Sequence, residues 1–82
     1  MGVIILDKDT IENRLRENNI LFDSVRKNKE GFTITQNNPS YADGIDGWVI
    51  RIENALPECY VNDFKKTIAP SQYKAHLYEG EF

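Results

Sequence analysis

A single cysteine, Cys59, and a single histidine, His76, limit how this chain can be held together. One cysteine cannot form an internal disulfide, and one cysteine with one histidine cannot complete a four-coordinate zinc site. The stability of the 82-residue chain must therefore come from burying apolar side chains in one small core. We expect a single domain over residues 1–82, with no metal and no other cofactor.

The small size also argues against an enzyme. A chain of this length buries only about 60–65% of its unfolded surface, so a spacious catalytic cleft would take residues from the core. Cys59, His76 and Asp63 offer a nucleophile, a base and an orienting acid, but no motif for an exposed nucleophile surrounds the cysteine. The glycines form no phosphate-binding pattern. We expect no enzymatic activity.

The charge is unevenly distributed along the chain. Ten basic and thirteen acidic residues leave a net charge of -3, which belongs entirely to residues 42–82. A protein that binds nucleic acid needs clustered positive charges to neutralise the phosphates. The negative overall charge therefore argues against nucleic-acid binding by this chain alone. The acidic half either faces a basic partner surface or simply keeps a small domain in solution.

The first residues carry no targeting signal. No basic segment precedes the apolar run of residues 3–6, which is too short for a signal peptide or a membrane span. We expect a cytoplasmic protein that does not enter a membrane. The abundance of Asn, Ile and Lys, whose codons are AT-rich, suggests a low-GC bacterium or a phage as the source.

The N-terminal third predicts a strand followed by a helix. Residues 3–6 are rich in β-branched side chains and predict the strand. Asp9 or Thr10 is the expected cap of the helix, and Ile11 and Leu15 lie one turn apart on its apolar face. The helix thus has a narrow buried stripe.

Two consecutive asparagines leave the next segment open. Asn lowers helix propensity and tolerates the left-handed conformation at a helix end, so the helix ends at residues 18–19 and residues 20–26 form a strand, or else the helix continues to Val25. We favour the strand. Turn-forming residues 27–31 and the alternating residues 32–36 then predict a β-hairpin.

In the second half, the sequence predicts a long loop, a strand and a helix. Residues 37–47 are dense in turn formers, and residues 48–53 alternate so that Trp48, Ile50 and Ile52 share one face of a strand. Four apolar residues at helical spacing predict a second helix, namely Tyr60, Val61, Phe64 and Ile68.

The last segment, residues 71–79, fits either a strand or a short helix. Together the elements predict an α+β fold: a small single domain with an antiparallel or mixed sheet of three to five strands and two helices packed on one face.

The loop and the surplus tyrosines suggest a docking surface. The acids between residues 43 and 47 lack the alternate spacing of a calcium loop, so we interpret them as recognition residues on a loop. Several tyrosines lack an apolar stripe, and tyrosine is enriched at protein interfaces. The candidate partner-binding residues are Tyr41, Asp43, Asp46, Tyr73 and Tyr78.

The only concentrated positive charge is at the predicted hairpin tip. Arg26, Lys27 and Lys29 fall within four positions, where they could touch a phosphate backbone. Asp23 and Glu30 flank them and weaken the positive field. These three basic residues are the candidate nucleic-acid site.

Three functions follow from these patterns. The first is a small acidic protein-binding module that blocks a larger bacterial or phage-targeted partner; in size, charge and lack of catalytic motifs the chain resembles small acidic phage inhibitors and immunity proteins, although in composition only. The second is a nucleic-acid-binding regulator that uses the basic hairpin tip. The third is a self-associating structural component.

Overall fold

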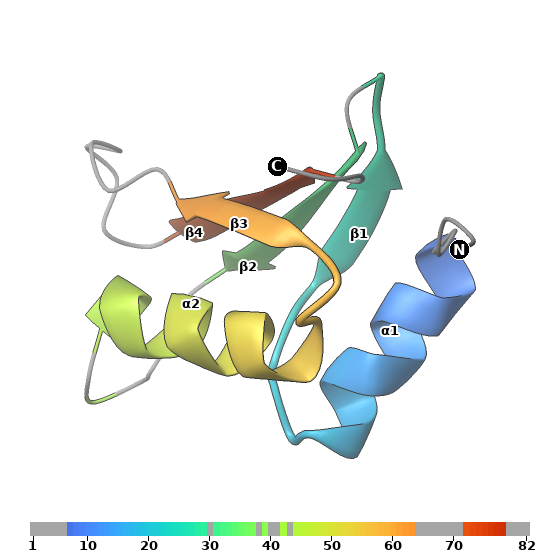
Figure 1. Ribbon diagram of the computed structural model, residues 1–82. Coiled ribbons are helices and arrows are strands. Elements are labelled where there is room, and N and C mark those ends of the chain that lie inside the picture. The colour runs from blue at the N-terminus through green and yellow to red at the C-terminus, as the bar shows by residue number, and fades with distance from the viewer. Residues whose placement is uncertain are drawn as a thin grey trace.

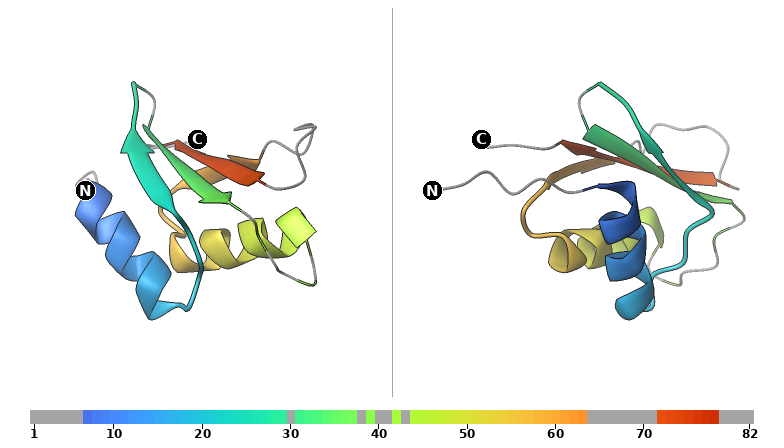
Figure 2. Two further views of the ribbon diagram at one scale, coloured as in Figure 1. Left: turned by 180° about the vertical axis from the view of Figure 1, so that it is seen from behind. Right: turned by 90° about the vertical axis from the view of Figure 1, so that its right-hand side faces the viewer.

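Two helices cover one face of a four-stranded sheet (Figures 1 and 2). The computed structural model describes residues 7–29, 31–37, 39, 42, 44–63 and 72–78. Its elements are α1 (Lys8–Glu17), β1 (Ser24–Lys27), β2 (Gly31–Asn37), α2 (Gly44–Ala55), β3 (Tyr60–Asp63) and β4 (Gln72–Tyr78). All strand pairs are antiparallel, in the order β1-β2-β4-β3. The predicted α+β class is confirmed.

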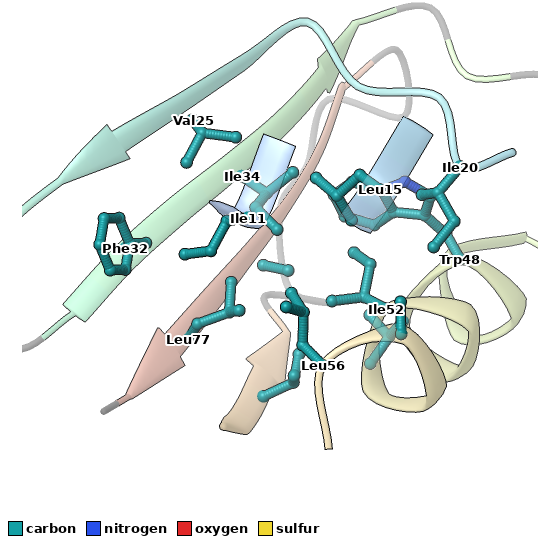
Figure 3. Packing of buried hydrophobic residues seen from close by; sticks show 14 residues of the cluster. Ile11, Leu15, Ile20, Val25, Phe32, Ile34, Trp48, Ile52, Leu56 and Leu77 are labelled. Carbon is teal, nitrogen blue, oxygen red and sulfur yellow. The ribbon is translucent and has the colours of Figure 1, made fainter. Parts of the chain in front are cut away.

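The hydrophobic core lies between the sheet and the two helices (Figure 3). In β2, Phe32 and Ile34 are fully buried, whereas Thr33 and Thr35, which alternate with them, are only half-buried. The alternation follows from the period of a strand, which sends successive side chains to opposite faces. The sheet therefore has a covered face and an open face. The largest fully buried side chains are Trp48, Phe32, Ile11, Leu15, Ile34, Ile52, Leu56 and Leu77.

Helix α1 begins earlier than the sequence predicts and ends where it predicts. The cap is Asp7, whose Oδ1 accepts a hydrogen bond from the backbone N–H of Thr10 at 2.8 Å, and not Asp9 or Thr10. Hydrogen bonds from the side chain and from the backbone of Thr10 lower the pKa of Asp7. At the other end Asn19 adopts φ 58°, a conformation that asparagine tolerates. The helix therefore ends at the asparagines.

The strand after α1 and the hairpin are confirmed, although β1 covers only the last part of residues 20–26 and extends to Lys27. The turn is held by Asn28, whose N–H donates to Gly31 O at 2.8 Å and whose Oδ1 accepts from Gly31 N at 2.9 Å. β1 and β2 then pair from Lys27 opposite Phe32 to Ser24 opposite Thr35.

The predicted strand at residues 48–53 is wrong, because this segment belongs to α2. Trp48 and Ile52 are fully buried, but Ile50 is 54% exposed and does not share their face. The predicted loop 37–47 is also too long, since the helix already starts at Gly44. A window wider than six residues shows the helical spacing of the apolar residues, which are Ile45, Trp48, Val49, Ile52, Ala55 and Leu56.

The predicted second helix is also wrong at its start, because residues 60–63 form β3. Phe64 and Ile68 lie outside the described residues, as does the predicted strand at residues 3–6. The strand alternative for the last segment is confirmed as β4, where Ala75 and Leu77 are buried. Neither helix of the described residues is long and apolar enough to cross a membrane.

An ion pair joins α1 to the turn that precedes β3. Arg14 Nη1 donates a hydrogen bond to Glu58 Oε1, and both side chains are partly shielded from solvent. This hydrogen bond holds the pKa of Glu58 below its ordinary value of 4.5 and raises the pKa of Arg14. The pair thus links the first helix to the end of the second.

The lowered pKa of Glu58 predicts a loss of stability in acid. A carboxylate whose pKa is lower in the folded state stabilises the fold above its unfolded-state pKa, and this contribution disappears as the pH falls through the folded-state value. We expect the free energy of unfolding in urea to fall below about pH 4.5. Glu58→Gln should lower it at neutral pH by about 0.5–1 kcal/mol and make the fall in acid smaller. A variant with the same acid profile as the parent would contradict this role.

Candidate functional site

The open face of the sheet is polar throughout the residues that the structure describes. It is formed by the positions that alternate with the buried ones, and their side chains are half-buried or exposed. The register aligns them in rows across β1, β2 and β4. We call this set the open face: Ser24, Arg26, Thr33, Thr35, Asn37, Gln72, Lys74, His76 and Tyr78.

The open face contains two cations, Arg26 and Lys74, and no carboxylate. Asp23 directly precedes β1, and its Oδ2 accepts a hydrogen bond from the N–H of Asn37 at 2.6 Å. Three ion pairs join cations of α1 to carboxylates, namely Lys8 to Glu12, Arg16 to Glu12, and Arg14 to Glu58. Neither Arg26 nor Lys74 takes part in these pairs.

A hydrogen-bond network orders the centre of the open face. Asn28 Nδ2 donates to Thr33 Oγ1 at 2.9 Å, and Thr33 Oγ1 lies 2.7 Å from Nδ1 of His76. Because the Asn28 amide already donates to this oxygen, the hydroxyl hydrogen of Thr33 is available to Nδ1 of a neutral imidazole. Such ordering reduces the conformational entropy lost when a partner binds.

Two aromatic rings stand side by side on β4, an inner strand of the sheet. The centroids of His76 and Tyr78 are 6.4 Å apart, with the ring planes at 48°. The residue opposite Tyr78 on β2 is Gly31, which has no side chain. A Cβ there would come within 1.9 Å of Leu77 O, so the close pairing of β2 with β4 requires this glycine.

Three of the predicted partner-binding residues, Asp46, Tyr73 and Tyr78, lie in the described part of the chain. Tyr41 and Asp43 lie outside the described residues, so a docking surface around the loop stays a prediction. Asp46 is in the first turn of α2, in the helical layer. The Tyr73 ring packs against Trp48 at a centroid distance of 5.6 Å, beside the core. Of the five, Tyr78 lies on the open face.

The three basic residues of the hairpin are also separated. Arg26 lies on the open face opposite Thr33, and Lys29 is exposed in the turn. Lys27 lies on the other side, with its Nζ 4.8 Å from the centroid of the Phe32 ring. Two of the three candidate nucleic-acid residues therefore remain at or near the open face.

Sequence reasoning missed Lys74 and His76 as site residues. A signal was present: residues 72–78 alternate between polar and apolar side chains, and the polar set includes both. The alternation alone does not show that β4 pairs with β2. This pairing places His76 opposite Thr33 and in the same row as Arg26.

The residues considered for catalysis or metal binding do not form a site. Cys59 packs against the core, on the helix side of the sheet, whereas His76 lies on the open face. Within the described part of the chain, no three His, Cys, Asp or Glu side chains gather where they could hold a metal ion. Comparisons with protein families, with curated proteins and with solved structures gave no match for this chain.

Proposed function

We propose that the protein is a nucleic-acid-binding regulator that acts without catalysis, in the cytoplasm, by holding phosphate groups on the open face. The observation that carries this proposal is the absence of carboxylates from the described side chains of a face that includes Arg26 and Lys74. Lys29 adds a third cation beside it. Opposite charge is the main source of affinity for a phosphate backbone.

The chemistry of the open face favours nucleic acid over protein. Its described side chains are Arg, Lys, His, Tyr, Ser, Thr, Asn and Gln, with no aliphatic residue. Most of these types contact phosphates and sugars. Protein interfaces instead have an apolar centre and are depleted in lysine and serine. Apart from Tyr78, a partner protein would find no large apolar side chain among these residues.

The net charge of -3 is compatible with this proposal because five of the described acids lie in the helical layer. Asp9, Glu12, Glu17, Asp46 and Glu53 all belong to the two helices, which the core separates from the open face. Exposed charges further apart than the Debye length, about 8 Å at physiological ionic strength, are largely screened from one another. The local field therefore decides binding.

Titration of a labelled oligonucleotide at several salt concentrations tests the proposal. Each phosphate contact contributes about -0.7 to the slope of log affinity against log salt for a single strand, so Arg26, Lys29 and Lys74 predict a slope of about -2. The double variant Arg26→Gln, Lys74→Gln should bind about 25-fold more weakly at about 0.1 M salt and reduce the slope to about -0.7.

A variant with the same net charge provides the control. Lys8→Gln with Arg16→Gln also removes two positive charges, but both belong to α1. This control should keep most of the affinity of the parent. Equal losses in the two double variants, or no binding by the parent at low salt, would contradict the proposal.

A second candidate function is protein binding through the helical layer, as expected of an inhibitor-type module. Among the described residues, Leu21 and Ile50 are large apolar side chains that are 55% and 54% exposed. Asp46 precedes Ile50 by one helical turn on α2, so the two share a face. We propose this face as the surface for a larger partner or for self-association.

Pull-down from a bacterial lysate and sedimentation test this candidate. Ile50→Lys should abolish capture of a partner, or lower the sedimentation mass if the chain self-associates. The open-face double variant should leave both unchanged. A monomeric parent that retains no protein would remove this candidate.

A further inference from the structure

We infer that the open face binds single-stranded nucleic acid, with an unstacked base on the ring of Tyr78. This inference rests on the proposed function and names the form of the ligand. It is carried by the placement of the two rings, of the small side chains on β2 and of two cations on the same face.

Both rings belong to the open face and are partly exposed. Tyr78 and His76 occupy successive outward positions of β4, with centroids 6.4 Å apart, on the face opposite the helices. A base in a duplex is stacked between its neighbours, whereas the bases of a single strand are free to stack on aromatic side chains. Neither helix lies on this face (Figure 2), so no helix of the described residues is placed to enter the major groove of a duplex.

The residues of β2 that lie opposite the outward positions of β4 are small. The outward positions of β2 opposite Tyr78, His76 and Lys74 are Gly31, Thr33 and Thr35. A strip of small residues therefore runs along β2, next to the longer side chains of β4. The glycine cannot gain a side chain without moving the backbone, because its Cβ would collide with Leu77 O.

Two cations lie on the same face as the rings, both nearer to His76 than to Tyr78. Arg26, Thr33 and His76 form one row across the sheet, so Arg26 stands two strand spacings, about 10 Å, from His76. Lys74 is the outward position before His76 on β4, about 7 Å along the strand. A single strand with one base on Tyr78 can thus cross His76 and bring its neighbouring phosphates to these two cations.

The His76 ring is already oriented for this role. Its Nδ1 is 2.7 Å from Thr33 Oγ1, and Asn28 Nδ2 donates to the same oxygen. The network links the turn of the hairpin to both inner strands. It also holds the ring of His76, which is the neighbour of the Tyr78 ring. Binding then requires little further ordering of the face.

Fluorescence anisotropy with a labelled oligothymidine and with a duplex of the same length tests the inference. We expect the single strand to bind at least tenfold more tightly. Tyr78→Ile replaces the ring by a β-branched side chain that suits a strand and should weaken single-strand binding about 5- to 150-fold. Tyr78→Phe keeps the ring and should bind as the parent does. Circular dichroism establishes that both variants are folded.

The outcomes separate this inference from the proposed function. Equal or tighter duplex binding, or a folded Tyr78→Ile variant with unchanged affinity, would overturn the single-strand inference while leaving nucleic-acid binding intact. No binding to either probe at low salt would overturn both. A polyglutamate peptide that binds as tightly as the oligothymidine would show that the face recognises any acidic chain, and this would also overturn the inference.

Discussion

Replacing Trp48 by alanine is expected to lower the free energy of unfolding by about 3–5 kcal/mol. Trp48 is the largest fully buried side chain. Its Nε1 donates to Leu21 O at 3.0 Å, and its ring packs against Tyr73. The truncation removes apolar burial, a hydrogen bond and an aromatic contact together. Since small domains have about 5–15 kcal/mol of stability in total, the variant should unfold at much lower urea concentration than the parent.

Ile50→Ala is the matched control on the same helix. Ile50 is 54% exposed, and alanine has the higher helix propensity, so the free energy of unfolding should change by no more than about 0.5 kcal/mol. In a strand over residues 48–53, Trp48 and Ile50 would share one face and both replacements would be costly. Comparable losses in the two variants would therefore contradict the assignment of α2.

Gly31→Ala is expected to lower the free energy of unfolding by about 3 kcal/mol. The added Cβ would stand 1.9 Å from Leu77 O and 2.9 Å from Leu77 C. Both are backbone atoms of the neighbouring strand, so no side-chain rotation relieves the clash, and β2 must move away from β4. The strain falls on the pairing of the two inner strands. Urea unfolding measures the loss.

The control for this variant is Gly44→Ala, at the start of α2. Gly44 has φ +70°, but the nearest atom to an added Cβ is Tyr73 Oη at 3.9 Å. The free energy of unfolding should fall only by the cost of holding alanine at a positive φ, which is about 1–2 kcal/mol. If Gly31→Ala is no more destabilising than Gly44→Ala, the inner strands are not paired as closely as the structure shows.

Local chemistry made part of this fold predictable. Asn18 and Asn19 end α1 because asparagine tolerates the positive φ that Asn19 adopts. The hairpin follows from a turn in which Asn28 holds the backbone of Gly31. In both places the decisive interactions join residues that are only a few positions apart. They can therefore be predicted from the sequence.

Segments whose structure depends on distant contacts were predicted less well. Residues 48–53 alternate and are rich in β-branched side chains, which favours a strand on local grounds. The helix prevails because Trp48 and Ile52, with residues on either side, form one continuous apolar face against the core. The short strand at residues 60–63 likewise forms through its pairing with β4.

For the candidate site, the sequence by itself determined which charges and rings exist, that Arg26 and Lys29 are close together, and that one small core without disulfides must hold the chain. Only the tertiary structure decided that Lys74 and His76 stand on the same face as Arg26. The physical reason is register: β2 pairs with its near neighbour β1 and also with β4, whose residues lie 35 to 47 positions further along the chain, from Asn37 opposite Gln72 to Gly31 opposite Tyr78. This pairing places Arg26 and Lys74 on one face, although the net charge of the whole chain is -3.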